Sequence, residues 1–344
     1  MRNDIPTVSN TTTRYRTNSQ WYEAGTLLAD AETTATDAAP VATETPTTVS
    51  VDKNISEYGN LGFFINMALI NAEQDGDVEL HSDSDASILT LGIDYRFTDN
   101  MIGGVAFNIN QSDTRFEGSS ATKGELESDG YSALLYSSFY YGDWFFDSSL
   151  TLGGDEYEQL REPTLLGNSY ESRFHGDQQS LSLSSGYDIH IGALNMTPYA
   201  QLVKGKVSID GYRETATNPG GPNTGATLQI DEQENDIGTL SLGSHFRWIF
   251  TTDSGVFVPV VSIAANKDLE DDAQVITGRF VGNTTLGGGF QMETNEVDTS
   301  YLVIGLGLSF QLKNGNAGFF NLETLEGYDN LDQQRITAGW RWEI

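Results

Sequence analysis

Residues 180–192 read SLSLSSGYDIHIG, and apolar side chains occupy almost every second position of this stretch. The apolar members are Leu181, Leu183, Tyr187, Ile189 and Ile191. Small, polar and charged residues fill the positions between them. Successive side chains of a β-strand point to opposite faces, so this period of two predicts a strand with one apolar and one polar face.

The same alternation returns along most of the chain, from residue 61 to residue 344. Runs of this kind predict twelve strands, near 61–74, 85–98, 101–115, 127–141, 143–157, 170–191, 194–212, 228–250, 255–267, 294–312, 316–325 and 333–344. Their connections alternate between tight turns, such as Gly142-Asp143 and Gly192-Ala193, and longer polar links.

This arrangement predicts an all-β fold, a transmembrane antiparallel β-barrel of twelve strands over residues 58–344. Tight turns on one rim would face the periplasm, and long loops on the other rim would be external. Strand runs of about 9–11 residues also suit a tilted crossing of the hydrocarbon layer. A soluble β-sandwich is the alternative, and it predicts irregular turn lengths at both ends.

Aromatic residues gather beside the tight turns. Phe139, Tyr140, Tyr141, Trp144, Phe145 and Phe146 flank Gly142-Asp143, and Phe246, Trp248 and Phe250 precede a second turn. Aromatic rings suit the membrane–water interface because they carry an apolar body and, in Tyr and Trp, a polar edge. We therefore expect an aromatic girdle at this rim.

Composition and charge exclude several classes of protein. The chain of 344 residues has 49 acidic and 18 basic side chains, for a net charge of -31. Such a field repels phosphate backbones, so nucleic acid is not an expected partner. There is no cysteine, which rules out disulfides and thiolate metal sites. No run of 18 apolar residues is present, so no transmembrane helix is expected.

Residues 1–57 form a separate N-terminal segment. The stretch 31–50 is rich in Thr, Ala and Pro and predicts a linker. Residues 19–32 could form a short helix, and residues 51–58 are left for a short lumenal stretch. The first residues lack the apolar core of a signal peptide, so we expect that an exported form of this protein begins upstream of residue 1.

The carboxyl end resembles the insertion signal of outer-membrane barrels. Its polar residue, glycine, aromatic and terminal hydrophobe would be Thr337, Gly339, Trp342 and Ile344. Residues 91–96 (LGIDYR), 197–200 (TPYA), 242–247 (LGSHFR) and 338–341 (AGWR) add weaker motifs. Together these stretches resemble the autotransporter β-domain, the translocator of type V secretion. This chain departs from the family in ending on Ile344 rather than Phe or Trp. Pro40 and Pro46 also interrupt the region of the usual lumenal helix.

The resemblance implies a cell outer membrane location and a barrel that anchors and helps export its N-terminal segment. It also implies outer-membrane lipid and lipopolysaccharide as surroundings, with the barrel assembly machinery and periplasmic chaperones as partners during biogenesis. Two alternatives stay open. One is a passive porin-like channel, and the other is a surface adhesin or phage receptor acting through external loops.

The residues predicted to line the lumen are small or polar members of the inward-facing set. They are Gly92, Asp94, Asn108, Asn110, Ser182, Asp188, Gly243 and Arg247. His190 and His245 also occupy inward-facing positions. A place in the polar lining of the lumen accounts for both without a catalytic role.

No catalytic residue, cofactor site or metal site is predicted. His81 with Asp83 and Asp85, and His175 with Asp177, faintly resemble the His and Asp pairs of omptin surface proteases, but their spacing is unspecific. Acidic runs at 75–77, 231–234 and 268–272 could attract divalent cations through oxygen ligands. A solvated loop explains these acidic runs more simply.

Overall fold

The computed structural model describes residues 60–75, 81–117, 122–163, 165–270, 275–282, 289–293, 299–312, 316–328 and 331–343. The helix, linker and lumenal stretch expected within residues 1–57, and the side chain of Ile344, lie outside these residues. Within the described residues, no helix is long and apolar enough to cross a membrane.

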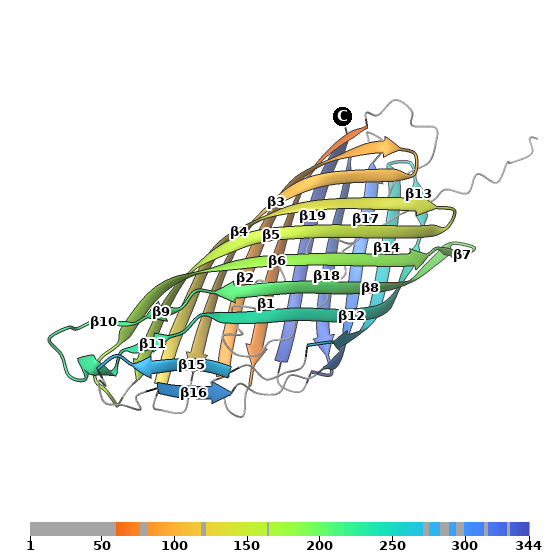
Figure 1. Cartoon of the computed structure of the whole chain (residues 1–344). Coiled ribbons are helices and arrows are strands. Elements are labelled where there is room, and N and C mark those ends of the chain that lie inside the picture. The colour runs from red at the N-terminus through yellow and green to blue at the C-terminus, as the bar shows by residue number, and fades with distance from the viewer. Residues whose placement is uncertain are drawn as a thin grey trace, which may run out of the picture.

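Twelve long antiparallel strands close into a barrel (Figure 1). They are β1 (Leu61–Gln74), β2 (His81–Thr98), β3 (Met101–Glu117), β4 (Thr122–Tyr141), β5 (Trp144–Pro163), β6 (Tyr170–Tyr187), β8 (Leu194–Ile209), β12 (Gln233–Trp248), β14 (Gly255–Asp268), β17 (Ser300–Leu312), β18 (Ala317–Glu326) and β19 (Leu331–Glu343). Short strands β7 (Ile189–Ile191) and β13 (Phe250–Thr252) lengthen two hairpins. The predicted strand number and fold class are confirmed.

Closure depends on the pairing of the first strand with the last. β1 pairs with β19 in register from Gly62 opposite Glu343 to Gln74 opposite Leu331, and β6 pairs with β8 further round the barrel. Every long strand therefore has two neighbours, so the described wall leaves no row of unpaired backbone groups facing lipid.

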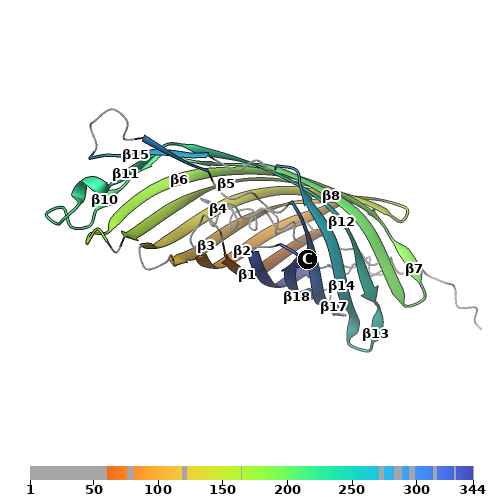
Figure 2. The same ribbon diagram turned by 90° about the horizontal axis from the view of Figure 1, so that it is seen from below.

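The two rims differ as expected. Tight turns, for example Gly142-Asp143 with Gly142 at φ 62°, lie on the same rim as the start of β1 and the end of β19. The long connections lie on the opposite rim. In Figure 2, β10 (Thr215–Ala216), β11 (Leu228–Ile230) and β15 (Val275–Phe280) lie at the left end and β7 and β13 at the right end.

Two of the long connections build an accessory sheet that the sequence did not predict. β9 (Tyr212–Arg213) and β11 (Leu228–Ile230) come from the link between β8 and β12. β15 (Val275–Phe280) and β16 (Gly289–Glu293) come from the link between β14 and β17. The single strand predicted over 228–250 was therefore wrong: β11 joins the accessory sheet, and β12 begins only at Gln233. β10 (Thr215–Ala216) pairs with β6, and η1 (Thr224–Ala226) follows it.

The outward face carries an apolar band and, beyond it, a charged extension. On β2, Leu91, Ile93, Tyr95 and Phe97 are exposed, whereas Asp83 and Asp85 continue the same face toward the long loops. Leu181 and Leu183 of the apolar face predicted for residues 180–192 are exposed as well. Leu242, Leu306 and Leu308 of other strands are also exposed, and Leu89 and Phe246 are half-buried. The strands are therefore longer than the bilayer requires.

The aromatic girdle is present, with one correction. Phe139, Tyr141, Trp144, Phe146, Trp248 and Phe250 are exposed beside the tight turns, and Phe246 is half-buried. Tyr140 and Phe145 are buried instead. They alternate with the girdle residues along β4 and β5, so strand parity turns them to the inside.

A charge placed in the apolar band should be costly. Leu91 is 46% exposed near the middle of the band, between Ile65 and Phe107 on the neighbouring strands. We expect Leu91→Arg to lower the free energy of unfolding by about 2–4 kcal/mol, because Arg at the bilayer midplane loses its hydration.

The matched control for Leu91→Arg is Asp85→Arg. Asp85 lies on the same face of the same strand but beyond the apolar band. We expect this change to cost little, since it loses only the exposed hydrogen bond from Asn71. Urea titrations of both variants in lipid vesicles would measure the difference, and equal losses of stability would contradict the face assignment.

Candidate translocation lumen

The inner face of the barrel is polar along much of its length. Six of the eight residues predicted to line the lumen are buried there: Asp94, Asn108, Asn110, Ser182, Asp188 and Arg247. Buried polar groups need hydrogen-bond partners, and most of these six find partners on neighbouring strands. The inner wall is therefore crossed by many polar contacts, although Asn108 Oδ1 and Asn110 Oδ1 are buried and accept no hydrogen bond within the described residues.

An ion pair joins β2 to β19 across β1. Arg341 donates two hydrogen bonds to the carboxylate of Asp94, one of them with Nη2 to Oδ1 at 2.6 Å. Tyr136 Oη donates to Asp94 Oδ2 at 3.4 Å. Gly62 lies between the two strands, and a Cβ there would come within 2.8 Å of Asp94 Oδ1. The absence of a side chain at Gly62 is what lets the pair form.

A second group of charged and polar residues spans β8. Thr197 Oγ1 donates to Asp188 Oδ1 at 2.6 Å, and Arg247 Nη1 donates to Thr197 Oγ1 at 3.0 Å. The nearest Arg247 and Asp188 atoms are 3.8 Å apart. Both ion pairs are buried on the inner wall near the tight-turn rim. Asp94 and Arg247 thus have partners within the barrel wall.

Hydrogen bonds between polar side chains line the next layer. Asn108 Nδ2 donates to Ser132 Oγ at 3.0 Å, and Gln201 Nε2 donates to Ser182 Oγ at 3.3 Å. Asn110 Nδ2 donates to a carboxylate oxygen of Asp155 at 3.0 Å. These contacts link side chains on β3, β4, β5, β6 and β8.

Aromatic rings cover the two predicted glycines. A Cβ at Gly92 would lie 1.8 Å from Phe64 Cζ, and a Cβ at Gly243 would lie 2.0 Å from Tyr199 Oη. Glycine in a strand commonly marks such a close approach. The ring of a neighbouring residue therefore covers each of these two glycines. The sequence had predicted only that both glycines line the lumen, and it gave no sign of the covering rings.

The C-terminal strand places its predicted signal residues on alternating faces. Thr337 is buried on the inner face, and Trp342 is 42% exposed on the outer face. A Cβ at Gly339 would lie 2.0 Å from Asn66 Oδ1. The strand therefore presents apolar side chains to lipid and small or polar groups to the lumen.

The four histidines differ in their exposure to solvent. His245 is buried and stacks on Tyr199 with ring centroids 5.0 Å apart. His190 is exposed, but it lies opposite the buried Asn195 of β8, in a register that continues from β6 without a shift. It therefore keeps the predicted inward parity and is exposed because it lies at the open rim. His175 is exposed on β6, opposite Glu156 of β5.

The long-loop end of the wall has contacts that the sequence did not suggest. Tyr157 stacks on Phe174 at 5.0 Å, and Phe174 stacks on Tyr212 of β9 at 4.1 Å. Arg161 donates two hydrogen bonds of 2.6 Å to the carboxylate of Glu214. These contacts fasten the link between β8 and β12 onto β5 and β6. The partners are far apart in sequence and show no local motif.

Several carboxylates of the acidic runs have partners in the protein. Glu234 lies 2.8 Å from Lys206, and Glu270 pairs with Lys204. Asp231 accepts a hydrogen bond from Thr277 at 3.1 Å. Residues 76–77 and 271–272 of the predicted runs lie outside the described residues. Asp268 is instead buried at the end of β14 and accepts a hydrogen bond from Thr239 at 2.9 Å, so the solvated-loop interpretation fits only the exposed members of these runs.

A closed antiparallel barrel with an outward apolar band, an aromatic girdle and a polar inner face is an outer-membrane β-barrel. A family model described as "Autotransporter beta-domain" matches residues 64–323. The chain belongs to this family, and it is a translocator barrel of the outer membrane.

The chain is also similar to part of longer curated proteins. The chain is 24% identical over 242 residues to Esterase EstA of Pseudomonas aeruginosa, covering 69% of this chain and 35% of that protein. It is 22% identical over 258 residues to Lipase 1 of Photorhabdus luminescens, covering 72% and 36%. The chain thus spans about a third of the length of these curated relatives.

Solved autotransporter domains share the fold. The translocator domain of NalP from Neisseria meningitidis superposes with a TM-score of 0.64 at 15% identity, covering 84% of this chain and 90% of that one. The transport unit of AIDA-I from Escherichia coli gives 0.56 at 11% identity, covering 96% and 100%.

Proposed function

We propose that this barrel exports the segment that precedes it in the chain and then anchors that segment at the cell surface. The observation that carries the proposal is the position where the chain enters the barrel. β1 begins at Leu61 on the tight-turn rim, which faces the periplasm in this fold. A preceding segment that ends outside must therefore pass through the lumen.

The dimensions and chemistry of the lumen support this route. Barrels of about eight strands are filled by their own side chains, and those of sixteen to eighteen leave a broad channel. Twelve strands leave room for one helix or one extended chain. The polar inner wall offers such a chain hydrogen-bonding groups in place of lipid.

The N-terminal segment, residues 1–57, is the proposed lumenal occupant, with residues 51–58 within the pore. Its Lys53 and Glu57 could meet charged groups of the wall only in competition with the pairs that Asp94 and Arg247 already make. We therefore propose weak retention of this segment, since wet ion pairs contribute only about 0–1 kcal/mol.

The outer-membrane location sets the lipid surroundings, and we propose three further partners. Lipopolysaccharide would surround the outer half of the apolar band. Periplasmic chaperones and the barrel assembly machinery would act during biogenesis, with the face pattern of β19 as the recognised element. We propose no enzymatic activity for the barrel: the two curated relatives carry hydrolase names, but each is matched over only about a third of its length.

Removing residues 1–57 should raise the ion conductance of the folded barrel in planar bilayers, because the segment would no longer fill the pore. The full chain is the control, and heat-modifiable migration would show that both forms are folded. Unchanged conductance would place the segment outside the lumen and contradict the route. High, stable conductance of the full chain would favour the porin-like alternative.

A surface receptor or adhesin remains the second candidate, because the accessory sheet forms an ordered external surface. Its exposed apolar side chains include Val275, 52% exposed, and Phe280, 44% exposed. Replacing both with Ser should lower binding to a host surface or phage only if this role is correct. The loop 211–227 is a poor target for truncation, because Glu214 within it fastens the loop to Arg161.

A further inference from the structure

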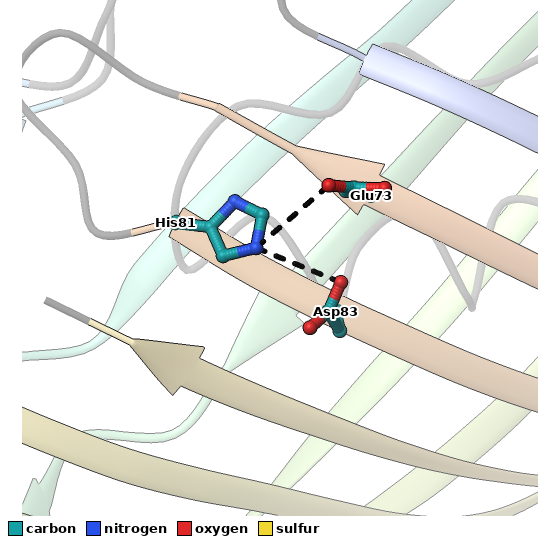
Figure 3. Close-up of side chains that lie close together, drawn as sticks. All are labelled: Glu73, His81 and Asp83. Atoms are coloured by element: carbon teal, nitrogen blue, oxygen red, sulfur yellow. Dashed lines mark ion pairs between the residues drawn. The ribbon is translucent and has the colours of Figure 1, made fainter.

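Three side chains with metal-binding atoms meet on the outer face of the β1–β2 hairpin, beyond the apolar band (Figure 3). Glu73 on β1 is directly opposite Asp83 on β2, and His81 is two residues before Asp83 on the same face. Their ligand atoms all lie within 4.8 Å of one another. Strand register alone therefore brings them together.

One ring nitrogen of His81 faces both carboxylates. Nε2 lies 3.9 Å from Glu73 Oε1 and 3.7 Å from Asp83 Oδ1. The other nitrogen, Nδ1, lies 2.7 Å from Asp75 Oδ1. A hydrogen on Nδ1 would be donated to Asp75, which leaves the lone pair of Nε2 directed at the two carboxylates. This is the outer-shell pattern that orients histidine ligands in metal sites.

We propose that Glu73, His81 and Asp83 bind a Zn²⁺ ion, with Asp75 as the residue that orients the imidazole. Zn²⁺ accepts nitrogen and carboxylate oxygen at about 2.0–2.2 Å, so tetrahedral ligands are separated by roughly 3.3 Å. The observed separations of 3.7 and 3.9 Å need only small side-chain movements. Solvent water would complete the coordination.

The imidazole is what distinguishes this site from the acidic loop runs. Ca²⁺ and Mg²⁺ prefer oxygen ligands alone, whereas imidazole suits Zn²⁺ and its transition-metal neighbours. Among the described residues, no carboxylate of the runs at 231–234 and 268–272 belongs to a comparable group of ligand atoms. The strongly negative chain would also concentrate cations near its surface.

The surrounding charges fit a cation site. In the sheet register Glu117 of β3 is opposite His81, Asp332 of β19 is opposite Glu73, and Arg115 of β3 is opposite Asp83. The hydrogen bond with Asp75 is the main reason that the pKa of His81 is raised above its ordinary value. Protons therefore compete with the metal, and binding should be measured at a pH above that raised pKa.

A bound ion would tie the two strands together where they leave the membrane. β1 also pairs with β19, so a clamp between Glu73 and Asp83 would strengthen the long-loop end of the hairpin next to the closing seam. The proposal is independent of translocation.

The test uses the full chain, purified without a polyhistidine tag and titrated with Zn²⁺ against a chromophoric competitor. Wild type should bind one equivalent saturably, and His81→Ala should abolish this binding. Asp83→Asn should weaken it, and Asp75→Asn should weaken it by roughly ten- to hundredfold, as for other outer-shell partners.

His175→Ala is the matched control, because His175 is also exposed on a strand beside acidic residues but belongs to no such ligand group among the described residues. It should leave Zn²⁺ affinity unchanged. All the substituted side chains are at least partly exposed, and heat-modifiable migration would verify folding. The proposal is overturned if wild type shows no saturable binding, if His81→Ala binds as tightly as wild type, or if His175→Ala loses as much affinity.

Discussion

A chain lacking residues 342–344 should fail to assemble into the outer membrane. Trp342 and Glu343 form the last pairs of β19 with β1, opposite Phe63 and Gly62. Removing them opens the seam at the tight-turn rim, where unpaired backbone groups would face lipid at a cost of several kcal/mol each. Trp342 also supplies an interfacial ring. The measurement is the amount of heat-modifiable, protease-resistant barrel in isolated outer membranes.

A parallel refolding experiment separates the two reasons for such a failure. If the shortened chain folds into lipid vesicles but not in cells, the missing residues act in recognition by the assembly machinery. If it fails in both, they act in closing the seam. Normal amounts of folded barrel in cells would contradict both the seam argument and the predicted insertion signal.

Replacing Arg341 with Ala should lower the free energy of unfolding by about 3–5 kcal/mol, the usual result of removing one partner of a buried ion pair. Asp94 is only 2% exposed, and Arg341 donates two hydrogen bonds to its carboxylate. Without the guanidinium, this carboxylate keeps one 3.4 Å hydrogen bond from Tyr136. Urea titration in lipid vesicles would measure the loss.

The double variant Asp94→Ala with Arg341→Ala is the control for that result. It removes both charges, and replacing a whole buried pair is often nearly neutral. We therefore expect it to be more stable than Arg341→Ala alone. A single variant as stable as wild type, or a double variant less stable than the single, would show that the pair does not hold β19 against the first hairpin.

Much of the fold could be predicted because a barrel wall has a simple local rule. Side chains alternate between lipid and lumen, so Leu181 and Ser182 were assigned to opposite faces from their spacing alone. Tight turns such as Gly142-Asp143 are equally local. The same rule, applied strictly, would have placed Tyr140 and Phe145 inside, where the structure has them.

Contacts between distant strands could not be predicted in this way. Asp94 and Arg341 are 247 residues apart, and they meet only because closure brings β2 and β19 to either side of β1. Arg161 and Glu214 meet through the fold of a long link. The accessory sheet likewise combines two links whose strands of two to six residues carry little periodic signal.

The unequal strand lengths make the wall of the barrel taller on one side than on the other at the long-loop rim. β4 and β5 have 20 residues each, whereas β18 has 10. At about 3.3 Å per residue, the longer strands run roughly 30 Å further along their own axes. The opening at the long-loop rim is therefore oblique: the wall is taller at β4 and β5 and lower at β18. A polypeptide emerging from the pore would meet the taller side, formed by β4 and β5, first and would be deflected sideways over β18 and β19.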